Sequence, residues 1–177
     1  MTEEEIIKEV LKGNINTYAE IIKKYKNYIY NLGMSIFNNY TETEDFTQEV
    51  FIKLYKNLKK YKSNFNFKTW LYKIAINTAK DFLRKKKFLP VSLEDHKNLI
   101  YSEDKVEESI QKNLESQMLL SLIRTLPEKY LNILILRYIE NLSYEEIAEV
   151  TSKPIGTVKT LLFRAKLLLA KKLKIQI

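Results

Sequence analysis

The sequence predicts an all-α protein in which two small helical domains are joined by a linker. Glycine and proline number only three each among 177 residues, which is too few for the frequent turns of a sheet protein. Apolar residues recur at helical spacing over most of residues 2–87 and again from residue 113 onwards. Between these blocks the periodicity is weak and six Asp or Glu residues occur. We therefore expect domains over residues 1–90 and 113–177, with an acidic linker over residues 91–112.

Four helices are expected in the first half. Apolar stripes over residues 6–11 and 18–37 predict the first two helices. Thr43 is expected to cap the third helix, because acidic residues follow it where the positive end of the helix dipole favours them. The polar and basic residues 59–68 predict a loop, and residues 69–86 predict a long fourth helix.

The end of the second half predicts a helix-turn-helix. Before it, Pro127 divides two helices, since proline is favoured in a first helical turn. Ser143 with Glu146 three residues later is a capping box that starts the first helix of the pair. Pro154 and Gly156 interrupt the helical pattern and restart it. Four apolar residues of the second helix recur at helical spacing and are expected to face inward: Val158, Leu162, Ala165 and Leu169.

Positive charge is concentrated in two blocks. Residues 53–87 hold twelve Lys or Arg and one acid, a net charge of +11, and residues 153–174 hold seven Lys or Arg and no acid. The remaining residues together carry a net charge of −10. A basic helix that follows a tight turn is how many proteins enter a DNA major groove. Two basic blocks in separate halves predict two separate contacts with a polyanion.

Several classes of function are disfavoured by composition. The chain has no cysteine, and its one histidine, His96, has no histidine or cysteine neighbour, so we expect no metal site and no cofactor. Apolar runs are too short for a membrane span, and the N-terminus is acidic where a signal peptide would be basic. We expect a cytoplasmic protein with no direct membrane insertion. The acids lie outside the basic blocks, so a nuclease or other enzyme is not expected, nor is a small-molecule substrate.

A second constellation lies on the fourth predicted helix. Trp70 and Asn77 fall at helical spacing, with Lys73, Lys80 and Arg84 on neighbouring turns. Cations hold phosphates, an amide can bond a base edge, and aromatic faces stack on unpaired bases. The alternative is that Trp70 belongs to the core and the lysines only solvate the helix.

Three segments in order resemble a bacterial sigma factor of the extracytoplasmic-function group of the sigma-70 family. They are TEDFTQEVFIKLY (43–55), FKTWLYKIAINTAKD (67–81), and LPEKYLNILILRYIENLSYEEIAEV (126–150) followed by KPIGTVKTLLFRAK (153–166). The resemblance spans nearly the whole chain. It implies a non-enzymatic subunit that binds core RNA polymerase, directs it to promoters and helps to open the −10 element. It also implies control by an anti-sigma factor.

The resemblance implies a role for each half of the chain. Residues 1–90 would dock on the clamp coiled coil of the largest polymerase subunit and read the −10 element, and residues 113–177 would read the −35 element, with the polymerase flap as a further partner. The implied polymerase-binding residues are Asp45, Gln48, Glu49 and Phe51. The implied −10 residues are Trp70, Lys73, Asn77, Lys80 and Arg84, with Ser63 and Asn64 in a pocket for an extruded base. The implied −35 residues are Gly156, Thr157, Lys159, Thr160, Phe163, Arg164 and Lys166.

The chain departs from the family pattern at three places. Ser63-Asn64 stands where a glycine is usual, and Leu161 stands where an arginine is common. Thr151-Ser152 replaces a Leu-Gly turn, and a left-handed Ser152 would cost about 1–2 kcal/mol. The alternative function is a stand-alone, dimeric helix-turn-helix regulator, which would explain residues 113–177 but not the first two motifs.

Overall fold

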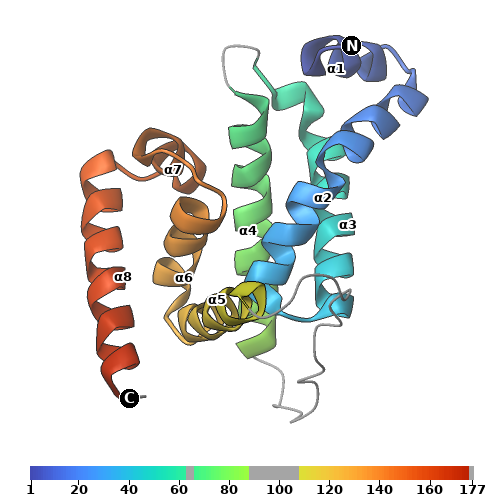
Figure 1. The fold of residues 1–177 in the computed structure, drawn as a ribbon. Helices are drawn as coiled ribbons and strands as arrows, with labels where there is room; N and C mark the ends of the chain where they lie inside the picture. The colour runs from blue at the N-terminus through green and yellow to red at the C-terminus, as the bar shows by residue number, and fades with distance from the viewer. Residues whose placement is uncertain (63–65, 88–107, 176–177) are drawn as a thin grey trace.

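A computed structural model describes residues 1–62, 66–87 and 108–175 of the chain. These residues form helices and contain no strand, which confirms the all-α prediction (Figure 1). Among them, no helix is long and apolar enough to cross a bilayer. In order, the elements are α1 (Glu3–Leu11), the short turn η1 (Ile15–Thr17), α2 (Tyr18–Phe37), α3 (Tyr40–Asn57), η2 (Leu58–Lys60), α4 (Phe67–Lys87), α5 (Glu108–Arg124), α6 (Glu128–Leu134), the π-helical turn η3 (Ile135–Ile139), α7 (Tyr144–Thr151) and α8 (Ile155–Ile175).

Helices α1 to α4 form an N-terminal unit whose core lies between α2, α3 and α4. Phe46 of α3 is fully buried and makes edge contacts with Phe37 of α2 and Phe82 of α4, with ring centroids 5.3 and 6.1 Å apart. Gly33 lets α2 and α3 approach closely, because a Cβ atom there would lie 2.8 Å from the Phe46 ring. These contacts determine where α4 lies, and α4 carries most of the residues implied for the −10 element.

The start of α3 differs from the prediction. Asn39 is the N-cap, and its side-chain oxygen accepts a hydrogen bond of 2.9 Å from the Glu42 amide. Thr43 lies one turn inside the helix and is fully buried. The prediction of Thr43 as the cap was therefore wrong, because Asn39, a stronger capping residue, starts the helix one turn earlier.

Helices α5 to α8 form a C-terminal unit. The predicted capping box at α7 is confirmed, since Ser143 accepts from the Glu146 amide at 3.1 Å and the Glu146 carboxylate accepts from the Ser143 amide at 2.7 Å. Pro127 lies just before the first residue of α6. The four inward-facing residues predicted on α8 pack as expected: Val158, Leu162 and Ala165 are buried and Leu169 is partly buried against the core.

The two units touch each other, although the sequence suggested separate domains on a tether. Helix α7 lies beside α4 (Figure 1). The Tyr72 hydroxyl of α4 donates a hydrogen bond to the Glu140 carboxylate, which precedes α7. Arg124 of α5 donates to the backbone carbonyls of Ser35 and Met34 at the end of α2, at 3.0 and 3.3 Å. Helix α5 begins at Glu108, within the predicted linker, and the rest of that linker up to residue 107 lies outside the described residues.

The close approach of α2 and α3 can be tested with Gly33→Ala. We expect the free energy of unfolding to fall by about 1–2 kcal/mol, because the added methyl group overpacks against a fully buried ring. Gly156→Ala is the matched control, since a Cβ atom there meets nothing within 4 Å. Urea denaturation monitored by circular dichroism measures both variants. Equal stability of the two variants would contradict the proposed contact.

Candidate nucleic-acid interface

One stripe of α4 faces solvent and carries the residues implied for the −10 element. Asn77 and Arg84 are exposed, whereas Trp70, Lys73 and Lys80 are half-buried. Trp70, Lys73 and Asn77 line one pocket of about 270 Å³, together with Lys53, Asn57, Lys60, Ile74 and Thr78. The structure thus brings three of the five residues together in a pocket with two further lysines, Lys53 and Lys60.

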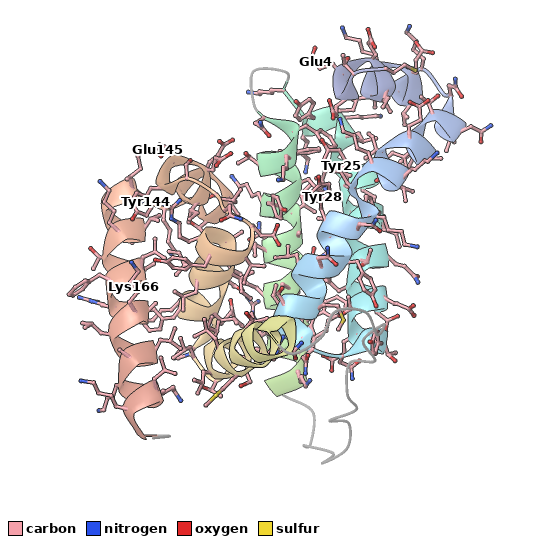
Figure 2. The ribbon with its side chains drawn as sticks, viewed as in Figure 1. Glu4, Tyr25, Tyr28, Tyr144, Glu145 and Lys166 are labelled. Atoms are coloured by element: carbon pink, nitrogen blue, oxygen red, sulfur yellow. The ribbon has the colours of Figure 1, made fainter. Side chains whose placement is uncertain are left out.

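Trp70 packs against the core and also lines the pocket. Its ring packs against the core and lies 5.1 Å from the Tyr61 ring and 5.9 Å from the Phe67 ring, measured between centroids. Tyr25 of α2 continues this aromatic cluster, 5.3 Å from Phe67 (Figure 2). Trp70 still lines the pocket beside Asn77.

Tyr61 was missed in the sequence analysis, because it lies in a loop where helical spacing gives no signal. Ser63 and Asn64 lie outside the described residues.

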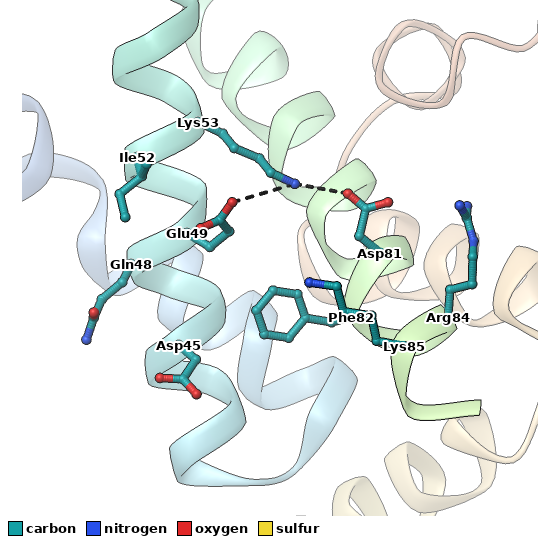
Figure 3. Close-up of a pocket in the computed structure, with 9 residues that line it drawn as sticks. All are labelled: Asp45, Gln48, Glu49, Ile52, Lys53, Asp81, Phe82, Arg84 and Lys85. Atoms are coloured by element: carbon teal, nitrogen blue, oxygen red, sulfur yellow. Dashed lines mark hydrogen bonds and ion pairs between the residues drawn. The ribbon is translucent and has the colours of Figure 1, made fainter. Parts of the chain in front are cut away.

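A charged cleft of about 640 Å³ separates α3 from α4 (Figure 3). Lys53 spans it from α3, with its ammonium group 2.9 Å from Asp81 and 3.9 Å from Glu49. Asp45 and Glu49, implied for polymerase binding, line this cleft, and so does Arg84, implied for the −10 element. The residues implied for polymerase binding and those implied for the −10 element therefore lie on adjoining surfaces of one unit.

An apolar groove of about 590 Å³ lies on the other side of α3, against α2. Ile52 is 46% exposed there, and Gln48 and Ile52 line both the groove and the charged cleft. In Figure 3 the Gln48 and Ile52 side chains point away from α4. Phe51 also lines the groove but is only 7% exposed, and its carbonyl accepts a hydrogen bond from the Tyr18 hydroxyl. Phe51 is therefore mainly a core residue, with little surface to offer a partner.

The outer face of α8 is a second basic surface. All seven residues implied for the −35 element are exposed: Gly156, Thr157, Lys159, Thr160, Phe163, Arg164 and Lys166. Phe163 is 61% exposed, so most of its ring is available for contact. Ser152 adopts the left-handed conformation considered from the sequence, with φ 54° and ψ 42°, and it ends α7 without glycine. Leu161 packs partly against the core.

Three residues missed in the sequence analysis flank this surface. Tyr144 of α7 lies between two cations, with Arg137 4.9 Å and Lys159 5.8 Å from its ring centroid. The ring centroid of Tyr138 lies 5.4 Å from the Lys166 ammonium group, and interaction with the Tyr138 side chain raises the pKa of Lys166. Figure 2 shows Tyr144 and Lys166 on neighbouring helices of this unit. The signal available in the sequence was the alternation of aromatic and basic residues on either side of the turn.

The arrangement is suited to binding a polyanion rather than to catalysis. Both surfaces present cations beside an amide or an aromatic ring, which are groups that hold phosphates and bases. In the described part of the chain, no group of three or more His, Cys, Asp or Glu residues could hold a metal ion.

Comparison with known proteins identifies relatives across the whole chain. The family described as sigma-70 region 2 matches residues 21–88, and sigma-70 region 4 matches residues 116–169. The ECF RNA polymerase sigma factor SigW of Bacillus subtilis is 37% identical over 95% of this chain and 95% of its own length. The ECF RNA polymerase sigma-E factor of Escherichia coli K12 is 31% identical over 94% of this chain and 91% of its own length.

Two solved structures share the fold. CnrH, solved in complex with the cytosolic domain of CnrY, superposes with a TM-score of 0.70 at 18% identity, covering 97% of both chains. The sigma factor RpoE of Bartonella quintana, solved with the anti-sigma factor NepR, superposes with a TM-score of 0.66 at 20% identity, covering 90% of this chain and 98% of that one. At these identities the likeness concerns the fold alone.

Exposure predicts which residues of α8 serve stability and which serve binding. Leu162→Ala should lower the free energy of unfolding by about 2–5 kcal/mol, because the side chain is 3% exposed and its removal leaves a cavity. Arg164→Ala should change that free energy by less than about 0.5 kcal/mol, since the residue is exposed. Thermal unfolding of both variants measures the difference. A large loss for Arg164→Ala would show that Arg164 holds the fold.

Proposed function

This chain belongs to the extracytoplasmic-function group of the sigma-70 family, and we propose that it selects promoters through the surfaces on α3, α4 and α8. It is an RNA polymerase sigma factor with no catalytic activity of its own. It binds core polymerase and promoter DNA and so directs the start of transcription. The observation that carries the proposed residue roles is that Asn77 and the α8 residues are exposed on helices whose opposite faces are buried.

The stripe on α4 is proposed to read the −10 element. Asn77 would hydrogen-bond a base edge, and the exposed Arg84 with Lys73 and Lys80 would hold phosphates. The pocket beside Trp70 would receive a base extruded from the opened duplex, where an aromatic ring can stack on it. Ser63 and Asn64 are proposed to complete this pocket.

The outer face of α8 is proposed to read the −35 element. Thr157, Thr160, Phe163 and Arg164 would face the major groove, and Lys159 and Lys166 would hold the backbone. A Cβ atom at Gly156 would meet nothing within 4 Å, so the fold itself does not require glycine there. The absence of a side chain at Gly156 would instead let the backbone of α8 come close to DNA. Arg137 and Tyr144 would extend the cationic surface toward the phosphates.

The exposed ridge of α3 is proposed as the polymerase-docking surface. Asp45, Gln48 and Glu49 would contact a basic face of the clamp coiled coil, while the apolar groove beside them would take apolar side chains. Phe51 would add only its exposed edge. The flap is proposed to contact the C-terminal unit. The whole assembly would work in the cytoplasm, where core polymerase is found.

An anti-sigma factor is proposed to control this chain. The RpoE protein of similar fold was solved with its anti-sigma factor NepR.

The proposed domains are residues 1–90 for docking and −10 recognition and residues 113–177 for −35 recognition, with residues 91–112 between them. The two family matches, 21–88 and 116–169, fall within these bounds and support them.

Run-off transcription with core polymerase tests the function, and Asp45→Arg tests the docking surface. The wild-type chain should direct core polymerase to specific start sites. Asp45→Arg should abolish co-purification with core polymerase, because it reverses the charge at an exposed position of the proposed contact. Glu20→Arg is the matched control, a similar reversal at an exposed residue of α2 outside the groove and the cleft. Normal co-purification of Asp45→Arg would reject this docking surface.

Asn77→Ala separates DNA reading from polymerase binding. We expect transcription from a selected promoter to fall by about 5- to 150-fold, which corresponds to the 1–3 kcal/mol of a base contact. Co-purification with core polymerase and the free energy of unfolding should stay unchanged, since the side chain is exposed. Run-off assays on promoters varied at each −10 position provide the measurement. An unchanged base preference would count against this role.

The alternative of a stand-alone dimeric regulator makes the opposite prediction. Such a protein would elute as a dimer in gel filtration and would shift a specific DNA fragment without polymerase. Tight, specific DNA binding by such a dimer without polymerase would reject the sigma-factor mechanism proposed for the α3 and α4 surfaces.

A further inference from the structure

The first helix, α1, carries none of the residues proposed above for polymerase or DNA. The family match for sigma-70 region 2 begins at residue 21, well after α1 has ended. The helix is nevertheless firmly held, since its apolar face is buried and a capping box starts it. It lies at the end of the N-terminal unit where α4 begins (Figure 1), and it packs against α2 and η2. Helix α1 is therefore placed to act on the residues that start α4.

Glu3 of α1 binds two side chains of α2. Its carboxylate accepts a hydrogen bond of 2.8 Å from the Tyr25 hydroxyl and another from the Lys24 ammonium group, with which it forms an ion pair. The hydrogen bond from Lys24 lowers the pKa of Glu3, and burial raises the pKa of Tyr25. Glu3 is therefore a charged acceptor and Tyr25 a neutral donor at physiological pH. Hydrogen bonds to a charged group are stronger than those between neutral groups.

From Tyr25 a run of aromatic rings leads to Trp70. Tyr25 is 7% exposed, and its ring centroid lies 5.3 Å from that of Phe67. The Phe67 ring is buried in turn and lies 5.9 Å from the Trp70 ring. Tyr61 lies against both, 5.4 Å from Phe67 and 5.1 Å from Trp70. Close packing leaves such rings few rotamers. The orientation of the Trp70 ring therefore depends on where Tyr25 is held.

Trp70 is the member of this run that reaches the candidate −10 pocket. It lines the pocket together with Asn77, seven residues later and so about two turns further along the same stripe of α4. Tyr25 and Phe67 are not among the lining residues. A half-buried ring that turned freely would lose rotamer entropy when a base stacked on it. A ring that is already fixed avoids that cost.

Resting on the proposed function, we propose that Glu3 of α1 is a positioning residue for promoter opening. Through Tyr25 it holds the Trp70 ring in the orientation that stacks on an extruded base. Extruding a base costs a few kcal/mol, so opening depends on a capture site that is ready beforehand. Helix α1 itself does not contact DNA, because the three acids in its first turn repel phosphates. Loss of the Glu3–Tyr25 hydrogen bond slows opening without weakening the first binding of the closed duplex.

Fluorescence of the free chain tests the positioning step, because Trp70 is the sole tryptophan in the sequence. Tyr25→Phe removes the donor and Glu3→Met the acceptor, while each keeps roughly the size of the side chain. Both variants should show a faster decay of Trp70 fluorescence anisotropy and stronger quenching by acrylamide. Glu9→Met is the matched control, the same change on the same helix, which removes an ion pair of 2.8 Å with Lys12. Wild-type decay in both Tyr25→Phe and Glu3→Met would overturn the proposal.

Promoter opening by the holoenzyme tests the consequence. A fluorescent adenine analogue in the −10 element brightens when it unstacks, and filter binding measures the first association with the duplex. Both variants should slow opening about tenfold, the loss expected for a hydrogen bond to a charged group, and leave first association within about twofold of wild type. The double variant should open no more slowly than the slower single variant, since both changes remove one hydrogen bond. Equal losses in association and opening would show a merely structural role and reject the proposal.

The outcomes distinguish this proposal from the proposed function. The Trp70 measurements on the free chain require neither polymerase nor promoter. Failure of the wild-type chain in run-off transcription would reject the promoter-reading role, whatever the anisotropy of the variants. Successful transcription by the wild type, with variants that open promoters at the wild-type rate, would reject the positioning role of Glu3 alone. Urea denaturation of each variant confirms that a faster Trp70 decay comes from a folded chain.

Discussion

The close packing of α4 on α2 and α3 is the constraint on which both candidate surfaces of the N-terminal unit depend. Phe46 contacts Phe37 and Phe82 in one aromatic cluster, and Gly33 leaves the space that this cluster needs. Because this packing holds α3 and α4 side by side, the acidic ridge of α3 and the basic stripe of α4 come to face opposite edges of one cleft. A protein that must hold polymerase and DNA at once can therefore do so with two neighbouring helices and no enlarged core.

Two lysines at the junction of α3 and α4 are paired with acids, whereas, in the part of the chain that the structure describes, Arg164 on the outer face of α8 is not. Lys53 pairs with Asp81 and Glu49, and Lys86 pairs with Glu42 at 2.8 Å. Such ion pairs between partly exposed groups add little stability. They nevertheless join α3 to α4, and pairing lowers the net charge that these lysines present to other molecules. Arg164 forms no ion pair within the described residues, so its charge remains available to phosphates.

The sequence was sufficient to predict features that depend on local patterns. The helical periods, the capping box at Ser143 and the inward face of α8 follow from spacing along a single element, and the structure agrees. Thr43 failed as a cap because Asn39, four positions earlier, is a stronger capping residue and starts the helix one turn sooner. The docking of the two units could not be predicted either. It involves Tyr72, Glu140 and Arg124, which are far apart in the chain, and no spacing pattern within a single helix pairs them.

The π-helical turn η3 has a consequence for how this architecture can vary among proteins. A turn of this kind holds more residues than an α-helical turn, so it rotates everything after it around the helix axis. Glu140 and the start of α7 therefore point toward α4 because of a residue count rather than a side-chain choice. Deleting one residue from Ile135–Ile139 would leave Tyr72, Glu140 and Arg124 in the chain and still aim the helix-turn-helix in another direction. In such a fold, insertions and deletions can change the geometry of docking more readily than substitutions can.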